Sequence, residues 1–214
     1  MYDGGKLMNG RTFSHDGNWN VLCLPFDVSK LAGTPLEGAT IKTLDTSSFA
    51  GGKLTLTFSD ATTTEAGKPY VVKWESGSNV ENPTFSGVTV TATEGTAVET
   101  TNVSFKGILS PIGLTADDRS SLYWGQDNTL SYPDARVVVG LYRAYLLLKG
   151  ITVGDLADGV RSIELNLGGG ATGINAVEGK TDEVSGEYYD LNGRRVTHPG
   201  KGVYIVNGRK VVMK

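Results

Sequence analysis

The clearest structural signal in the chain is Lys53-Leu-Thr-Leu-Thr-Phe-Ser59. Its large apolar residues Leu54, Leu56 and Phe58 alternate with Thr. Because successive side chains of a β-strand point to opposite faces, this pattern predicts a strand with one face in a core. The same alternation predicts strands at 88–93 and 162–167. We expect one core to be built from Trp19, Leu22, Leu24, Leu54, Leu56, Phe58, Val88, Val90, Phe105, Ile163 and Leu165.

Turn-forming residues separate many further short apolar stretches, and no pattern for a helix of ten or more residues is present. We expect residues 11–14 and 19–24 to pair as a hairpin, and residues 28–33 to form a single helical turn. The stretches 136–142 and 144–149 are typical of strands that are buried on both faces or cross a sheet corner. Short strands with regular turns predict an all-β fold, either a β-sandwich or a barrel-like sandwich. Other predicted strands are 40–44, 70–74, 103–109, 122–125 and 129–132.

The glycine-rich stretch that begins at Gly168-Gly-Gly-Ala-Thr-Gly173 is the strongest linker signal. It divides the chain into a β-sandwich-like domain at 1–167, a linker at 168–186 and a short C-terminal β-hairpin tail at 187–214. Asn207-Gly208 suits the tight turn of that hairpin, since both residues tolerate positive φ. Because an isolated hairpin is marginal in water, the tail must pack on the main domain, pair with a strand near 188–191 or be completed by a partner.

Composition excludes several classes of protein. The 214 residues are 39% hydrophobic, with a net charge of -3, and the mean hydropathy is -0.15. No global basic field recruits nucleic acid or an anionic membrane. No apolar run reaches the roughly 18 residues that a transmembrane segment needs. Residues 1–5 lack the pattern of a signal peptide, so we expect an exported protein to be represented here by a fragment or a trimmed chain.

Cys23 is the single cysteine, so no disulfide can form within the chain. Its neighbours Val21, Leu22 and Leu24 are apolar. A nucleophile would need a partner His in a recognisable local signature, and none is present. We therefore expect Cys23 to be a small buried core residue.

The chain carries no recognisable catalytic or metal-binding motif. His15 and His198 lie in turn-like contexts, and the His-Glu-x-x-His pattern is absent. Asp117-Asp118 and the Asp155–Asp158 region offer oxygen atoms to calcium but match no EF-hand loop, so we interpret them as solvated loop carboxylates. We therefore predict that the chain is not an enzyme and holds no cofactor or metal.

The aromatic residues of the predicted hairpin at 122–132 are the best candidates for ligand binding. An aromatic face can stack on the apolar face of a sugar ring, and neighbouring amides can bond its hydroxyl groups. The alternative is that these aromatic side chains belong to the core, because large aromatics usually bury most of their surface. The candidate ligand-binding residues are Tyr123, Trp124, Gln126, Asn128 and Tyr132.

Five blocks of residues 11–167 resemble, in their order, a module that recurs in surface and secreted proteins of Bacteroidetes. The blocks are Arg11-Thr-Phe with Gly17-Asn-Trp-Asn-Val-Leu-Cys-Leu-Pro-Phe26, Ala66-Gly-Lys-Pro-Tyr-Val-Val-Lys-Trp74, Phe105-Lys-Gly-Ile-Leu-Ser-Pro111, Leu122-Tyr-Trp-Gly125 and Arg143-Ala-Tyr-Leu146. The resemblance implies surface location and no catalysis.

The C-terminal residues resemble the last part of a type IX secretion C-terminal sorting domain. That resemblance implies export, surface display and a contact with secretion machinery. The residues that carry it are Asp190, Leu191, Asn192, Gly193, Arg194, Gly202, Tyr204 and Lys214.

Three functions follow as hypotheses. The first is a non-catalytic, secreted or cell-surface module for adhesion or protein interaction, whose partner is a surface glycan or a host or bacterial protein. The second is a carbohydrate-binding module that uses Tyr123 and Trp124. A glycoside hydrolase is the least favoured, because sequence spacing cannot supply the required separation of two carboxyl groups. The sequence leaves the ligand and the oligomeric state open.

Overall fold

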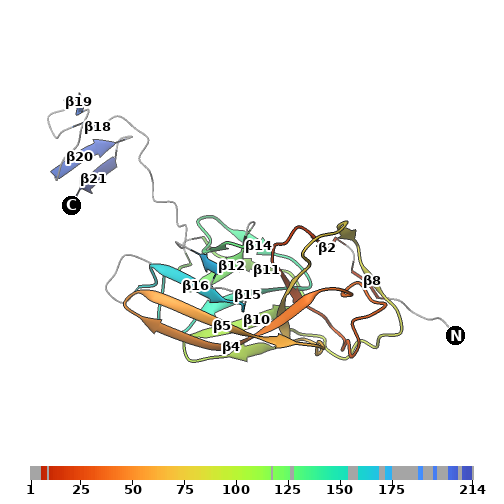
Figure 1. The fold of residues 1–214 in the computed structure, drawn as a ribbon. Helices are drawn as coiled ribbons and strands as arrows, with labels where there is room; N and C mark the ends of the chain where they lie inside the picture. The colour runs from red at the N-terminus through yellow and green to blue at the C-terminus, as the bar shows by residue number, and fades with distance from the viewer. Residues whose placement is uncertain are drawn as a thin grey trace. The chain divides into compact units, whose positions relative to one another are not determined.

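The computed structural model describes residues 6–8, 10–116, 118–125, 128–153, 159–168, 172–174, 188–189, 195–196, 202–206 and 209–213. Every element in these residues is a strand, and the predicted all-β fold is confirmed (Figure 1). The chain forms two compact units, Met1–Val177 and Glu178–Lys214.

The first unit is built on two sheets that face each other as a β-sandwich. The six-stranded sheet has the order β17 (Thr172–Ile174), β16 (Ser162–Asn166), β5 (Lys53–Ala61), β4 (Thr40–Ala50), β6 (Pro69–Lys73) and β3 (Asn20–Cys23). The five-stranded sheet has the order β13 (Leu130–Ser131), β12 (Ser121–Trp124), β15 (Arg143–Leu148), β10 (Val103–Ile108) and β9 (Ala97–Glu99). Neighbouring strands are antiparallel, except that β16 runs parallel to β5.

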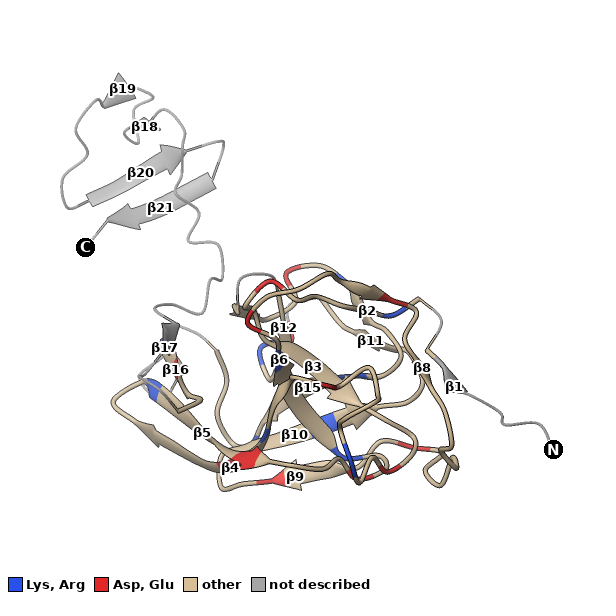
Figure 2. Ribbon diagram, turned by 45° about the vertical axis from the view of Figure 1, so that its right-hand side comes forward, with Lys and Arg blue, Asp and Glu red and all other residues tan. Residues whose placement is uncertain are grey.

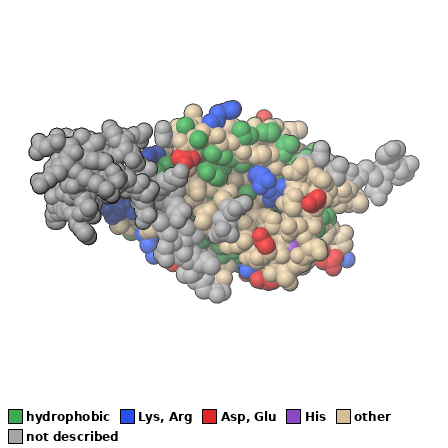
Figure 3. Space-filling view, turned by 90° about the horizontal axis from the view of Figure 1, so that it is seen from above, with side chains coloured by type: hydrophobic (Ala, Val, Ile, Leu, Met, Phe, Trp, Pro, Cys, Tyr) green, Lys and Arg blue, Asp and Glu red, His purple; other side chains and the backbone are tan. Residues whose placement is uncertain are grey.

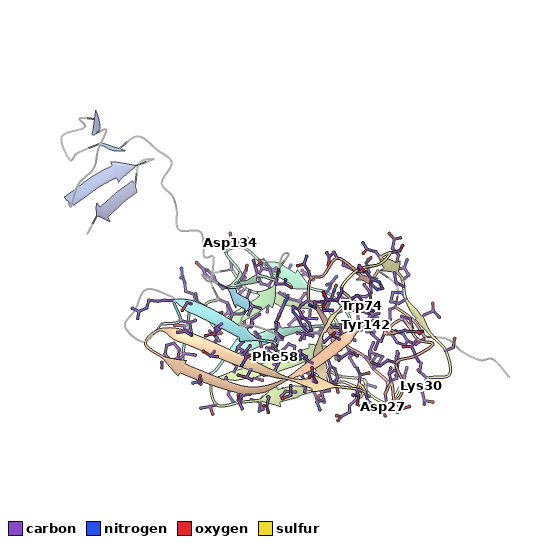
Figure 4. All side chains as sticks on the ribbon, in the orientation of Figure 1. Asp27, Lys30, Phe58, Trp74, Asp134 and Tyr142 are labelled. Atoms are coloured by element: carbon purple, nitrogen blue, oxygen red, sulfur yellow. The ribbon has the colours of Figure 1, made fainter. Side chains whose placement is uncertain are left out.

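The main core lies between these sheets and contains the predicted inward face of β5. Leu54, Leu56 and Phe58 are buried there, and Phe58 lies amid the strands in Figure 4. The Phe58 ring meets the Phe105 ring of β10 edge-on, with 6.1 Å between centroids, so the two sheets are joined through aromatic packing. Other buried members are Trp19, Val21, Leu44, Val71, Val103, Leu122, Leu130, Ala144, Leu146, Leu148, Ile163 and Leu165.

β3 and β6 are buried on both faces, which creates a second core. Val21 and Val71 belong to the main core, whereas Leu22, Tyr70 and Val72 belong to the second. The other face is covered by two short strand pairs and by residues 26–39, which include buried Phe26, Val28 and Leu36. These pairs are β1 (Lys6–Leu7) with β8 (Thr84–Phe85), and β2 (Thr12–Phe13) with β7 (Val80–Glu81).

Three local predictions in this region are wrong. Residues 11–14 and 19–24 do not form a hairpin, because β2 pairs with β7 and β3 pairs with β6. No helical turn forms at 28–33; Val28 instead makes a β-bridge with Thr64. Residues 88–93 form no strand, since the amides of Thr91 and Ala92 both bond the Pro25 carbonyl, and Val90 is 49% exposed. Val88 is half-buried against the second core, and neither valine belongs to the main core.

A third apolar cluster covers the outer face of the five-stranded sheet. It joins Ile108, Leu114 and Val139, with Tyr123 and Tyr145 packed against them. Leu114 and Val139 come from the paired strands β11 (Ile112–Leu114) and β14 (Val137–Val139). Burial alternates along β15, and Val138 is 59% exposed. The strands of the predicted stretches 136–142 and 144–149 are therefore not buried on both faces, which is one of the two alternatives expected for them.

The second unit contains a four-stranded sheet in the order β19 (Arg195–Val196), β18 (Tyr188–Tyr189), β20 (Gly202–Val206) and β21 (Arg209–Met213). β20 and β21 are antiparallel, with Val206 opposite Arg209. The predicted turn residues Asn207 and Gly208 lie outside the described residues. β18 pairs with β20, which is one of the three arrangements expected for the tail. β17 extends the large sheet into the range predicted as linker.

No helix among the described residues is long and apolar enough to cross a membrane. Basic and acidic residues are interspersed over the described strands and loops (Figure 2).

We expect Leu56→Ala to lower the free energy of unfolding by about 2–5 kcal/mol, because it leaves a cavity in the main core. Val90→Ala is the control: at an exposed site it should change stability by no more than about 0.5 kcal/mol. Urea denaturation followed by tryptophan fluorescence measures both. Equal losses of unfolding free energy in the two variants would contradict the assignment of Leu56 to the core and of Val90 to the surface.

Cys23 is buried, as predicted, and its thiol donates to the Gly67 carbonyl at 3.2 Å. Burial raises the pKa of this thiol to about 12. The thiol therefore stays protonated in the folded state at pH values where an unfolded cysteine has ionised.

The raised pKa of Cys23 predicts a stability difference that depends on pH. Above about pH 9 the unfolded chain loses the thiol proton while the folded chain keeps it, so the free energy of unfolding falls by up to about 1.4 kcal/mol per pH unit. Cys23→Ala lacks this contribution, and its stability should approach that of the parent between pH 8 and 10. Denaturation at several pH values measures the gap; a gap that stays constant contradicts the prediction.

Candidate functional site

A cavity of about 290 Å³ lies where β12 and β15 stop pairing. The last residues paired between these strands are Tyr123 and Tyr145. The cavity is lined by Tyr123 and Trp124 of β12, by Val137–Val139 of β14 and by Arg143 of β15, with Val21 of β3 on the facing sheet. The five-stranded sheet, the six-stranded sheet and the β11–β14 pair thus all contribute residues to this cavity.

Tyr123 and Trp124 reach the same cavity although neighbouring residues of a strand point to opposite faces. Tyr123 packs against the third cluster, and Trp124 packs against the main core. The Trp124 ring meets the Phe58 ring edge-on at 6.3 Å, which holds its position. Because the strands separate at this end, the cavity has access to residues of both faces. One ligand in this cavity can therefore contact both Tyr123 and Trp124, as the prediction of a shared binding site requires.

Trp124 differs from the other two tryptophans. Trp19 and Trp74 are buried, whereas Trp124 is half-buried and lines the cavity. Trp74 is held by its indole N–H bond to the Glu37 carbonyl at 3.0 Å and by stacking on His15, with 4.5 Å between ring centroids. His15 is thus a half-buried packing residue rather than a free surface residue, and His198 lies outside the described residues.

Arg143 is the only charged residue among the described residues that line the cavity. It is half-buried, and burial lowers its pKa. The preceding residue, Tyr142, fixes the start of β15: it packs against the second core, and its carbonyl accepts a bond from the Cys23 amide at 3.2 Å (Figure 4 labels Tyr142 and Trp74). Arg143 is therefore at the start of a strand, next to a residue that is hydrogen-bonded to β3 of the facing sheet.

Arg11 brings a second positive charge close to Arg143. It is almost fully buried, donates to the Val21 carbonyl and lies over the Phe13 ring at 5.7 Å. Burial, and then the charge of Arg143, lower the pKa of Arg11 to about 9. Within the described part of the chain, neither arginine makes an ion pair with a carboxylate.

Sequence reasoning missed both arginines. Arg11 immediately precedes the short strand Thr12–Phe13, and Arg143 opens an apolar strand, so each has the sequence context of an ordinary strand-end residue. Their proximity depends on the packing of β3 against β15, which no local pattern reveals.

Two of the predicted ligand-binding residues have other roles. Asn128 accepts a bond from the Trp19 amide and donates to the Asn18 side chain at 2.9 Å. Tyr132 packs against the main core and lies beneath the Arg119 guanidinium, which is 4.7 Å from its ring centroid. Neither lines the cavity. Gln126 lies outside the described residues.

The loop carboxylates are described only in part. Asp118 accepts bonds from the amide and hydroxyl of Ser120, at 2.9 and 2.6 Å. Asp117, Asp155 and Asp158 lie outside the described residues. Where side chains are described, no group of three or more His, Cys, Asp or Glu is placed to hold a metal ion.

A larger cavity of about 420 Å³ lies between residues 93–97 and the end of β10. It is lined by residues 93–97 and 106–110, which include Glu94 and Lys106 of opposite charge, and by Ile112 and Tyr145. Tyr145 is the one aromatic residue in the described lining, so this cavity matches the expected sugar-stacking arrangement less well than the cavity at Tyr123 and Trp124.

No protein-family model, curated protein or solved structure matches this chain. The resemblances to a Bacteroidetes surface module and to a sorting domain therefore stay predictions, and the geometry of the site carries the functional argument. Of the residues predicted to form the tail signal, Gly202 and Tyr204 lie in β20. Asp190, Leu191, Asn192, Gly193, Arg194 and Lys214 lie outside the described residues.

The role of Asn128 in folding predicts which substitutions it tolerates. Its φ is +60°, which Asn accepts more readily than Ala. Asn128→Ala should cost about 1–3 kcal/mol, since the part-buried Trp19 amide loses its acceptor. Asn128→Gly loses the same bonds without backbone strain and should cost less.

Chemical denaturation measures both variants. Asn79→Ala is the control, because it removes one exposed side-chain bond to the His15 amide and should cost least. If Asn128→Gly is the more damaging substitution at residue 128, the backbone argument is wrong.

Proposed function

We propose that this chain is a non-catalytic binding module of a surface-displayed protein, and that it holds a sugar ring in the cavity at Tyr123 and Trp124. The observation that carries the proposal is the presence of two half-buried aromatic side chains in the lining of one small cavity. This favours the carbohydrate-binding hypothesis over the more general adhesion hypothesis.

The size and lining of the cavity suit a single ring. Small-ligand sites commonly measure about 300–1,000 Å³, and this one, at about 290 Å³, is at the lower limit. Tyr123, Trp124 and Val137–Val139 supply apolar surface for the C–H face of a pyranose. The Tyr123 hydroxyl and the Arg143 guanidinium supply polar groups for its substituents.

The lining also favours binding over hydrolysis. A glycoside hydrolase places two carboxyl groups about 5–9.5 Å apart across the scissile bond. None of the described residues that line this cavity is Asp or Glu. Arg143 has a fixed positive charge and is a poor general acid or base.

A protein partner is the second candidate, because apolar side chains are exposed near the cavity. Val138 is 59% exposed and Leu141 is 39% exposed. Seen from above, the molecule presents hydrophobic side chains (green) gathered beside Lys and Arg (blue) (Figure 3). Two exposed residues form a small surface, so this candidate requires further contacts from the partner.

A glycan array followed by calorimetric titration tests the sugar proposal. Trp124→Ala should weaken binding of the best glycan by about tenfold or more, since stacking on this ring is lost. Leu141→Ser, outside the cavity lining, should leave sugar binding unchanged and weaken only a protein partner. Each variant is first checked by denaturation to be folded. Glycan binding that survives Trp124→Ala would contradict the sugar proposal for this cavity.

We also propose that residues 187–214 direct export, which rests on the resemblance to a sorting domain. Their strands belong to a unit separate from the one that holds the cavity. Deleting 187–214 should leave the first unit folded but keep the protein inside the cell envelope of a host with type IX secretion. Both forms are expressed with an added signal peptide, and culture supernatant is compared with the envelope fraction. Equal export with and without these residues would rule out the sorting role.

A further inference from the structure

Arg143 gives the cavity a charge that nothing described in the protein neutralises. It is the one charged residue in the described lining, and it makes no ion pair with a described carboxylate. Its guanidinium is partly stripped of water, and a half-buried charge without a counterion is costly. The apolar neighbours Val137–Val139 offer it no hydrogen-bond acceptor through their side chains.

Arg11 adds a second positive charge next to a residue of the cavity lining. It bonds to the carbonyl of Val21, a residue that also lines the cavity. Arg11 is almost fully buried, and its Nε–H has no acceptor in the described structure. Repulsion between two nearby guanidinium groups is weakly screened where water is excluded. An anion in the cavity would offset both charges.

The remaining lining explains why the anion would be part of a ring-shaped ligand. Tyr123 and Trp124 provide aromatic surface beside the guanidinium. A simple ion would use only Arg143 and would leave this apolar surface empty. A sugar ring with an acidic substituent uses both, with its C–H face on the aromatics and its anionic group on the planar fork of the arginine.

We propose that the ligand of this cavity is an acidic sugar, whose ring packs on Tyr123 and Trp124 and whose carboxylate or sulfate group binds Arg143. This rests on the proposed sugar-binding function and narrows it to a chemical class. Arg11 does not line the cavity, so it does not contact the ligand. It acts through its positive charge and through its hydrogen bond to the Val21 carbonyl.

The test is calorimetric titration of the full chain with matched sugars. The acidic probes are methyl glucuronide, methyl galacturonide and glucose 6-sulfate, and the neutral probes are methyl glucoside and methyl galactoside. At least one acidic probe should bind about ten- to a hundredfold more tightly than its neutral counterpart, as expected for charge-assisted hydrogen bonds. The uronides and the sulfate separate the two possible sources of the negative charge.

Arg143→Gln should remove the preference and leave weak binding of acidic and neutral probes alike. Arg143→Lys should keep part of the preference for acidic probes, because the lysine ammonium keeps the positive charge but lacks the planar guanidinium that bonds an anion through two N–H groups. Arg136→Gln is the matched control: it removes the same charge from an exposed arginine that does not line the cavity. It should keep the preference. Equal losses for Arg143→Gln and Arg136→Gln would overturn the proposal in favour of a general surface field.

Other outcomes separate this inference from the proposed function. If acidic and neutral sugars bind equally well and Trp124→Ala abolishes both, the sugar site stands and the acidic preference is wrong. If acetate or inorganic sulfate binds as tightly as the acidic sugars, and Trp124→Ala has no effect, the cavity is an anion site and the sugar proposal also fails. If none of these probes binds, the proposed function fails in this cavity, and the acidic-sugar inference fails with it.

Discussion

Burial of β3 and β6 on both faces is the constraint on which the rest of the first unit depends. Val21 and Val71 need the five-stranded sheet on one side, and Leu22, Tyr70 and Val72 need a second covering layer on the other. Strands too short to be stable alone supply that layer, because they gain the buried apolar surface of the larger sheet. This packing also carries Arg11 to the Val21 carbonyl, and so brings a buried charge close to the candidate site.

The sequence predicts the parts of this fold whose signal is local. Alternation identifies β5 and β16, and the aromatic hairpin is present as β12 paired with β13. The wrong hairpin at 11–24 has a physical reason: β2 pairs with β7, far along the chain, and the turn between β2 and β3 carries no information about that partner. The prediction for Val90 is wrong for a related reason, since alternation states which residues share a face but not whether anything covers it.

The candidate site could be predicted only in part. Tyr123 and Trp124 are adjacent in β12, so the chain itself places them close together. Both line one cavity only because the pairing of β12 with β15 ends there, and the sequence does not show where that pairing ends. Tyr132 and Asn128 are equally close in sequence, yet contacts with Arg119 and Trp19 give them other roles. Arg143 enters the cavity because β15 meets β3 and β14 there, and such an encounter between layers has no signature in any one stretch of sequence.

The parallel pairing of β16 with β5 has a consequence for how the protein reaches its native state. Leu54 has Ile163 as its cross-strand neighbour, so the entire five-stranded sheet intervenes in the chain between them. Closing so large a loop costs entropy before its contacts return any stability, which slows folding. The β4–β5 hairpin can form early, whereas its neighbour on the outer side arrives only after nearly the whole first unit has been synthesised. Until then one edge of β5 is unpaired and able to recruit other strands, so this module has a built-in period of vulnerability to aggregation.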